Sequence, residues 1–309
     1  MCGQRGLREW VEETVARLVL GAPEGRLSDF GGQAIFGAPL VGVADGDGPL
    51  FEQFKTAVGA RHFLPREILA AQAPADADLA EVRVIAWALP FTEPVRRSNR
   101  GGRWPSALYS LARNNGGALN YKVRRCLVEG LRQDGWAAVA PVSTRDYDAF
   151  RSAEHTFSSC WSERHVACAA GLGRFGLSGG LITPLGVNVR LGSVVTNLPL
   201  EPDVRRYTDH RAPCLAFGGA GCGRCIERCP AGAISPEGLD KSKCYAMRQA
   251  VRERRMESCV RTFEMLPAPI VKSGRTTQGY SLGCALCQCG VPCEASSPED
   301  AFAREESGA

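Results

Sequence analysis

The sequence predicts a mixed α and β domain over residues 1–205 and a small cysteine-rich domain over residues 206–309. In the first part, segments with helical apolar spacing alternate with short apolar runs that are typical of strands. In the second part cysteine becomes frequent, because ten of the 14 cysteines lie after residue 200. The change follows Leu198-Pro199-Leu200-Glu201-Pro202, where prolines end an apolar segment. A chain of 309 residues is long enough for two such domains.

The elements of the first part follow from local patterns. Residues 7–20 carry apolar side chains at helical spacing, and residues 82–89 form an apolar run ended by Pro90, which predicts a buried strand. The helical stretch 106–133 is interrupted by Asn114-Asn115-Gly116-Gly117, so we expect two helices there. We also expect a helix at 163–172 and strands at 136–142, 181–183 and 187–198.

Residues 91–105 form a basic segment that contains glycine and proline. One interpretation is a solvated surface loop. The other is a lid that turns its arginines toward an anion over a substrate site. The sequence leaves both open.

Composition and charge exclude several classes of protein. Hydrophobic residues make up 44% and charged residues 23%, which is ordinary for a soluble globular protein. The formal net charge of +4 is too small to argue for a nucleic acid partner. The sequence contains no run of 18 apolar residues, so it predicts no membrane span, and the charged N-terminal segment does not look like a secretory signal. We therefore expect a cytoplasmic protein whose thiols stay reduced, so the cysteines need a role other than disulfides.

The strongest motif is Cys222-Gly-Arg-Cys225-Ile-Glu-Arg-Cys229-Pro230, which continues into Ala-Gly-Ala-Ile234. Such close spacing brings several thiolates to one face of an iron–sulfur cubane, and the cysteine before proline reaches the other cluster in two-cluster ferredoxins. The usual first cysteine of the motif is absent, because Gly219 stands there. Cys214 lies eight residues before Cys222, across a glycine-rich stretch, and could fold back as the missing ligand.

A second group of cysteines completes the count for two [4Fe-4S] clusters. It is Cys284-Ala-Leu-Cys287-Gln-Cys289-Gly-Val-Pro-Cys293, preceded by Cys244 where a helix begins. With one ligand exchanged each way, the first cluster takes Cys214, Cys222, Cys225 and Cys293, and the second takes Cys229, Cys244, Cys284 and Cys287. Cys259 and Cys289 are left over, and either could replace Cys214. Structural zinc or plain buried thiols are the alternatives, although zinc sites rarely continue as Cys-Pro-Ala-Gly-Ala-Ile.

Residues 155–295 resemble the epoxyqueuosine reductase family and its shorter relatives. The resemblance is carried by Glu163-Arg164, by Ala-Gly-Leu-Gly-x-x-Gly ending at Gly176, by Gly192-Ser-Val-Val195 and by the cysteine motif. It implies a nitroreductase-like α/β core that binds cobalamin, followed by a ferredoxin-like domain with two clusters. In such proteins, as in reductive dehalogenases, the clusters reduce the corrinoid, whose Co(I) form drives a two-electron reduction.

Two departures from the family pattern bear on the substrate. The relatives carry a catalytic Asp six residues before the Glu of the Glu-Arg pair, and here that position is Phe157. The sequence also ends at Ala309, without the long helical-repeat extension that helps those enzymes engage tRNA. We therefore expect a small-molecule substrate and no nucleic acid or membrane partner. An external electron donor such as a ferredoxin or flavodoxin would supply the clusters.

The resemblance also nominates residues of the first part. The glycines of the Gly171–Gly176 turn would let the backbone approach the corrin closely. We expect the proton donor among His165, Glu163 and Tyr109, with Tyr147 and Arg164 as further candidates, while Glu163-Arg164 could instead be an ion pair that pins a helix to the sheet. Cys160 and Cys168 are expected to be buried small side chains. The predicted cofactor contacts are Arg164, Gly171, Leu172, Gly173, Gly176, Leu177, Ser178, Thr183 and Ser193.

Three other functions remain open on the sequence. A ferredoxin-type module could pass electrons to a partner without corrinoid chemistry. A nitroreductase-like core also suits FMN, which would give a flavin-dependent reductase. The last alternative is a corrinoid-binding or reactivation protein.

Overall fold

The computed structural model describes residues 4–205, 209–217 and 221–298. A four-stranded antiparallel sheet lies at its centre, in the order β3 (Leu40–Asp45), β4 (Arg83–Pro90), β10 (Val189–Thr196) and β5 (Ala138–Val139). Strand β4 is buried along almost its whole length, which confirms the buried strand predicted at 82–89. The strand predicted at 136–142 is shorter, because Pro141 begins a 3-10 turn, η3 (Pro141–Ser143).

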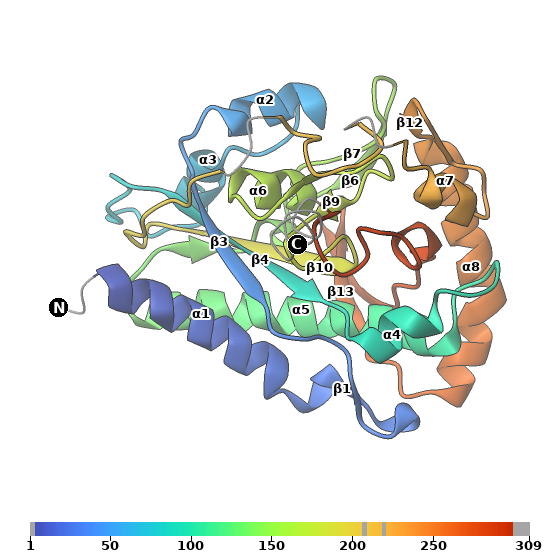
Figure 1. Ribbon diagram of the computed structural model, residues 1–309. Coiled ribbons are helices and arrows are strands. Elements are labelled where there is room, and N and C mark those ends of the chain that lie inside the picture. The colour runs from blue at the N-terminus through green and yellow to red at the C-terminus, as the bar shows by residue number, and fades with distance from the viewer. Residues whose placement is uncertain (1–3, 206–208, 218–220, 299–309) are drawn as a thin grey trace, which may run out of the picture.

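Helices cover both faces of this sheet (Figure 1). Helices α1 (Gln4–Leu20) and α5 (Ala107–Gln133) lie on one face, and α2 (Leu50–Ala57), α3 (Pro65–Ala70) and α6 (Glu163–Ala169) lie on the other. Val15 of α1 and Val123 of α5 belong to the core on the first face. Phe51 of α2 and Val166 of α6 belong to the core on the second face. Both faces of the sheet are therefore sealed by apolar side chains.

Helix α5 is continuous, so the prediction of two helices between residues 106 and 133 is wrong. The two asparagines that suggested a break face the C-terminal segment instead of capping a turn. Asn115 donates to the Glu264 carbonyl at 2.9 Å, and Asn114 donates to the Leu266 carbonyl at 2.9 Å. Gly116 lies against Phe36, where a Cβ would come within 2.6 Å of the ring. Tertiary contacts thus explain residues that look like helix breakers.

The C-terminal part packs onto the same core. It contains α7 (Arg224–Arg228), the hairpin β11 (Ile234–Ser235) and β12 (Gly238–Leu239), α8 (Lys241–Thr262), the hairpin β13 (Ala268–Lys272) and β14 (Arg275–Gly279), and the turn η4 (Leu286–Gln288). Val251 and Cys259 of α8 pack in one cluster with Val11 of α1. The apolar core therefore contains residues from both sides of the predicted boundary at 205/206. That boundary borders on residues outside the described ranges, and the division into two domains stays a prediction.

The remaining elements are short. Residues 91–105 contain a helix, α4 (Glu93–Ser98), so this segment is not a plain loop. The helix predicted at 163–172 ends at Ala169, and the predicted strands at 181–183 and 187–198 are β9 (Leu181–Ile182) and β10. The other elements are η1 (Pro23–Gly25), β1 (Arg26–Leu27), η2 (Ser28–Phe30), β2 (Gln33–Ala34), β6 (Ala149–Ser152), β7 (Thr156–Ser159) and β8 (Arg174–Phe175).

The architecture is a mixed α and β fold with one four-stranded sheet and several two-stranded ones. Among the residues described, no helix is both long and apolar enough to cross a membrane. All 13 cysteines that the structure describes are free thiols.

Candidate functional site

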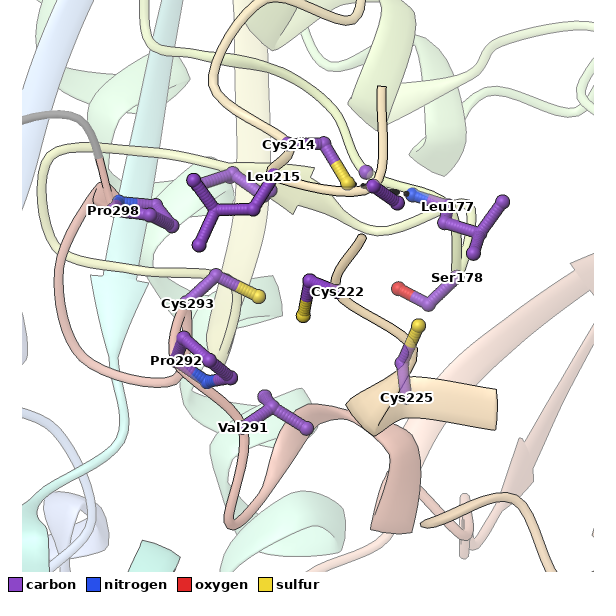
Figure 2. Close-up of a pocket in the computed structure, with 13 residues that line it drawn as sticks. Leu177, Ser178, Cys214, Leu215, Cys222, Cys225, Val291, Pro292, Cys293 and Pro298 are labelled. Carbon is purple, nitrogen blue, oxygen red and sulfur yellow. Dashed lines mark hydrogen bonds between the residues drawn. The ribbon is translucent and has the colours of Figure 1, made fainter. Parts of the chain in front are cut away.

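Cys214, Cys222, Cys225 and Cys293 line one pocket. Cys293 is about 70 residues away in the sequence from the other three, and the four thiols surround a common hollow (Figure 2). Cys225 lies in α7, whereas Cys293 follows η4 and Cys214 precedes the glycine-rich stretch. This is the set that the sequence predicts for the first cluster, and it includes Cys214 despite the gap that separates it from Cys222.

The wall of this pocket is apolar. Cys214, Cys225 and Cys293 pack against Ile182, Val187 and Val291. Burial and the neighbouring thiolates raise the pKa of Cys225 to about 11 and that of Cys293 to about 12. Thiolates crowded in this way repel one another, and a cationic iron core would remove that repulsion. The backbone N–H of Leu177 donates to Cys214 Sγ at 3.4 Å, as expected for a thiolate that ligates a metal.

Cys229, Cys244, Cys284 and Cys287 form the second group. Cys229 follows α7 directly, Cys244 lies in the first turn of α8, and the other two lie at η4. Burial raises the pKa of Cys287 well above its usual value, and the charges of Cys284, Cys244, Cys229 and then Cys225 add to the shift. The last of these cysteines belongs to the first group, so the two groups are neighbours.

The chemistry of these thiols fits iron–sulfur clusters. Each group supplies four thiols, which is the ligand number of a [4Fe-4S] cluster. In the part of the chain that the structure describes, no three His, Cys, Asp or Glu side chains are gathered as ligands of a single metal ion. Ligands of a cubane bind different irons and lie farther apart than those of one ion. The ligand assignment itself stays a prediction.

The two leftover cysteines are fully buried. Cys259 sits in the core between α8 and the helices on the first face of the sheet. The Cys289 thiol accepts hydrogen bonds from Asn188 at 2.9 Å and from Asn99 at 3.6 Å. Burial raises its pKa to about 12, so it stays a thiol at neutral pH. Neither is among the thiols that line the first pocket.

The segment 91–105 is tied to the cysteine-rich part rather than raised over an anion. Asn99 donates to the Cys284 carbonyl at 3.2 Å, and Arg100 pairs with Glu294 at 2.8 Å. Arg96 pairs with Glu93 at 3.0 Å. Because Arg96 and Arg100 already have carboxylate partners, they do not support the interpretation of residues 91–105 as a lid that faces an anion.

Glu163 is held at both carboxylate oxygens. Arg124 of α5 donates to Oε1 at 2.9 Å, and the Ser193 hydroxyl donates to Oε2 at 2.7 Å. Ser193 in turn accepts from the Trp161 indole at 2.9 Å. The expected pairing of Glu163 with Arg164 is wrong, because Arg164 donates to the Gly179 carbonyl instead. Glu163 and Ser193 thus join α5, α6 and β10 beneath the candidate site.

His165 is half-buried between the rings of Phe54 and Phe175. Burial, together with the charges of Arg164, His62 and Lys241, lowers its pKa to about 3. A neutral imidazole with so low a pKa does not carry a second proton at neutral pH, which argues against His165 as a general acid. The sequence did not single out His62, which is buried and accepts from the Ser162 backbone N–H at 3.1 Å.

Tyr109 is fully buried in α5, and its hydroxyl donates to Asn188 Oδ1 at 3.0 Å. Burial raises its pKa above the usual value. This placement argues against a role as proton donor to a substrate, since the hydroxyl faces the core. Tyr147 is half-buried, lies near Glu163 and Arg124, and has a pKa raised to about 12 by burial first and by Glu163 next.

Packing within the chain gives a reason for two of the glycines of the 171–176 turn. A Cβ on Gly173 would come within 2.2 Å of the Ile182 carbonyl, and one on Gly176 within 3.0 Å of the Ile182 side chain. Gly171 has a φ of +74°. The chain itself fills the space beside Gly173 and Gly176, because β8 and β9 pair closely here. Any contact of this turn with a cofactor stays a prediction.

The other predicted cofactor contacts divide between three places. Leu177 and Ser178 line the pocket of the first cysteine group. Leu172 is a core residue on the second face of the sheet. Thr183 is buried, and its hydroxyl closes a turn by donating to the Gly186 carbonyl at 2.9 Å.

Phe157 stands on the hairpin of β6 and β7 and faces the start of α8. Its ring stacks on Tyr245 at 4.8 Å, with the Arg151 guanidinium 5.0 Å above it. Lys241 donates to the Phe157 carbonyl at 3.3 Å. Tyr245 is the residue after Cys244, so this hairpin lies beside the second cysteine group.

Sequence reasoning missed two arginines, Arg113 of α5 and Arg190 of β10. Arg113 and Arg190 have buried Nε atoms that lack a hydrogen-bond partner among the described residues. Arg190 Nη2 donates to the Arg113 carbonyl at 2.6 Å, and burial, to which the charge of Arg113 adds, lowers the pKa of Arg190. Neither arginine sits in a recognisable motif, and only the fold brings α5 and β10 together.

Comparison with known proteins agrees with the resemblance. The chain is 35% identical over 130 residues to the epoxyqueuosine reductase of Synechocystis sp., a match that covers 41% of this chain and 36% of that protein. A crystal structure of selenomethionine-labelled epoxyqueuosine reductase aligns with a TM-score of 0.50 at 16% identity, over 97% of this chain and 71% of that one. No family profile matches the chain.

These findings place the chain in a class of mixed α and β proteins, and its relatives in that class are oxidoreductases. The chain is similar to epoxyqueuosine reductases, as its motifs predicted, and the match spans about a third of the length of the curated relative named above.

A second solved structure is an epoxyqueuosine reductase with a tRNA-Tyr epoxyqueuosine-modified tRNA stem loop, and it aligns with a TM-score of 0.49 at 17% identity, over 80% of this chain and 58% of that one. The expectation that this chain has no nucleic acid partner stays a prediction.

Proposed function

We propose that the chain is a reductase that uses two [4Fe-4S] clusters and cobalamin to carry out a two-electron reduction of a small molecule. The observation that carries the proposal is the presence of two neighbouring groups of four thiols, within a chain that is similar to epoxyqueuosine reductases. Residues 1–205 would form a nitroreductase-like cofactor domain, and residues 206–309 a ferredoxin-like domain. The electron donor would be a ferredoxin or flavodoxin.

The two thiol groups would hold the clusters close together. Cys225 of the first group is near enough to Cys287 of the second for its charge to add to the raised pKa of Cys287. An electron could therefore pass between the clusters inside the protein. Asn99, Asn188 and Arg228 fix the loop between these ligands, since Arg228 donates to the Cys289 carbonyl at 3.1 Å.

A corrinoid fits the donors that the first part of the chain offers. Its rim carries amide and phosphate oxygens, and the unpartnered Nε atoms of Arg113 and Arg190 are donors that such oxygens would satisfy. When bound, a corrinoid supplies the metal centre at which a two-electron reduction takes place.

Tyr147 is the best of the predicted proton donors. Glu163 is held by Arg124 and Ser193, His165 is neutral, and Tyr109 faces the core. Tyr147 keeps its proton at neutral pH and is half-buried near the Glu163 carboxylate. A tyrosine in this position could donate a proton to a substrate.

Retention of cobalamin by anaerobically reconstituted protein tests the proposal. Corrin absorption bands should survive desalting beside the broad cluster absorbance near 400 nm. We expect Arg190→Gln to lower corrin retention at least about tenfold, because a charged donor is lost from a buried site. Arg125→Gln, at an exposed position of helix α5, is the control and should bind as the unaltered protein does.

Full iron content without retained corrin bands would contradict the cobalamin proposal and favour the electron-transfer protein. Retained flavin absorbance after reconstitution with FMN would favour the flavin-dependent alternative.

A further inference from the structure

The two cysteine groups differ in the charge that surrounds them. Arg113 packs directly against the second group, because a Cβ on Gly283, the residue before Cys284, would lie 2.1 Å from Arg113 Nε. That Nε is buried and has no hydrogen-bond partner in the described part of the chain. Its guanidinium charge therefore has no protein acceptor that competes for it at this atom.

A second cation approaches the same group from α8. Arg248 follows Cys244 by four residues on this helix, so both side chains lie on one face. Within the described ranges, neither Arg113 nor Arg248 has a carboxylate within ion-pair distance. Burial raises the pKa of the Cys244 thiol, and the charges of Arg248, Arg164 and Arg113 oppose that rise.

The first group has a different environment. The described residues that line its pocket are cysteines, apolar side chains, glycine and Ser178, with no Lys, Arg, Asp or Glu among them. Ile182, Val187 and Val291 pack against its thiols. The two groups do not differ in this way in their backbone hydrogen bonds. In the first group Cys214 accepts one from Leu177 at 3.4 Å, and in the second group Cys229 accepts one from Ala233 at 3.3 Å.

Charge near a cluster sets its reduction potential. A [4Fe-4S] cluster with four thiolates is anionic, and each added electron makes it more negative. A guanidinium in a partly buried site stabilises the reduced form more than the oxidised form. An apolar wall does the opposite.

We propose that Arg113 and Arg248 give the cluster at Cys229, Cys244, Cys284 and Cys287 a higher reduction potential than the cluster at the first group. This inference rests on the proposed function, because it requires both clusters. One electron leaves the reduced first cluster and reduces the oxidised second one, with no bond made or broken. A ferredoxin or flavodoxin then reduces the first cluster again.

The direction matters because of where the second cluster lies. Tyr245, next to Cys244, stacks on Phe157 of the β6–β7 hairpin. Lys241 of the same turn donates to the Phe157 carbonyl. Electrons would thus gather on the cluster that adjoins the candidate reaction site, rather than on the one whose thiols line the pocket of the first group.

A potentiometric titration of the reconstituted protein, followed by electron paramagnetic resonance, tests the inference. The unaltered protein should show two one-electron waves. Arg248→Gln and Arg113→Gln should each shift only the higher wave to a lower potential. At a fixed potential, the ratio of reduced to oxidised second cluster should fall about tenfold, which corresponds to about 59 mV for one electron. Arg113→Lys and Arg248→Lys should restore most of the shift, because they restore the charge.

Arg252→Gln is the matched control, since Arg252 is an exposed arginine on the same helix α8, one turn farther from Cys244. It should leave both waves in place. Arg248 is also exposed, so its variant keeps the test available if Arg113→Gln does not fold. A shift of the lower wave, or no shift in Arg248→Gln, overturns the inference while the full iron content keeps the proposed function. Fewer than two clusters in the unaltered protein would overturn the proposed function itself.

Discussion

At the scale of single residues, Glu163 shows how a candidate acid becomes a structural anchor. Its side chain is 18% exposed and that of Arg124 is 10% exposed, so their ion pair is largely shielded from water. The carboxylate also accepts from Ser193 on the neighbouring strand β10. A pair in this setting is costly to break from one side, because the remaining charge stays buried without a partner.

We therefore expect Glu163→Gln to lower the free energy of unfolding by about 3 kcal/mol. Glu129→Gln is the control. Glu129 pairs with Arg125 on the exposed side of α5, with Oε1 3.7 Å from Arg125 Nε, and both side chains are 58% exposed. That change should cost less than about 0.5 kcal/mol. Chemical denaturation of both variants measures the difference. Equal costs would show that the buried pair contributes no more than the exposed one.

His62 predicts how stability depends on pH. Burial lowers its folded pKa to about 4, while the unfolded chain has the ordinary value of about 6.5. Below pH 6.5 the unfolded state binds a proton that the folded state refuses until about pH 4, so stability falls as the solution is acidified through this window. The slope from this residue approaches about 1.4 kcal/mol per pH unit.

Unfolding midpoints at pH 7.5 and 5.5 measure this effect. His62→Gln should be less stable at pH 7.5 but should lose less stability on acidification. His210→Gln is the control, because the His210 side chain is 66% exposed. An unchanged slope in His62→Gln would contradict the assignment of the acid sensitivity to this residue.

At the scale of elements, two of the three glycines in helix α5 have opposite surroundings. A Cβ on Gly116 would lie 2.6 Å from the Phe36 ring, whereas one on Gly130 would meet only the Trp10 ring at 3.7 Å. We expect Gly116→Ala to destabilise the protein by about 1–3 kcal/mol, because the core has no room. Gly130→Ala should stabilise it by about 0.5–1 kcal/mol, because alanine favours the helix.

Thermal unfolding of the two variants provides the comparison. If both variants shifted the unfolding temperature by the same amount in the same direction, the contacts of Gly116 and Gly130 would not explain the change in stability.

The same helix marks what the sequence could and could not predict about the fold. The strand at 82–89 was predictable, because its apolar run bounded by Pro90 is a local pattern, although its partners β3 and β10 are distant in the sequence. The continuity of α5 was not, because Asn114 and Asn115 are satisfied by residues 264–266, some 150 positions away. The 171–176 turn was recognised as special, but its glycines serve the pairing of β8 with β9.

At the scale of the whole molecule, the structure brings together the cysteines in the two groups that ferredoxin spacing predicts. That pattern is readable in the sequence because ligand spacing is a local property. The arginines beside the second group and the tether of Asn99 to Cys284 are not readable, because they depend on how α4 and α5 dock against η4. Local motifs therefore predicted which thiols lie together, while the charge around them required the fold.

The number of clusters per chain tests the central claim most directly. Iron and sulfide analysis of anaerobically reconstituted protein should give about eight of each per chain. Cys287→Ser should give about four, and Cys289→Ser should keep about eight, because the Cys289 thiol is buried against Asn99 and Asn188 rather than grouped with the others. About four irons in the unaltered protein, or loss of a cluster in Cys289→Ser with none lost in Cys287→Ser, would contradict the account.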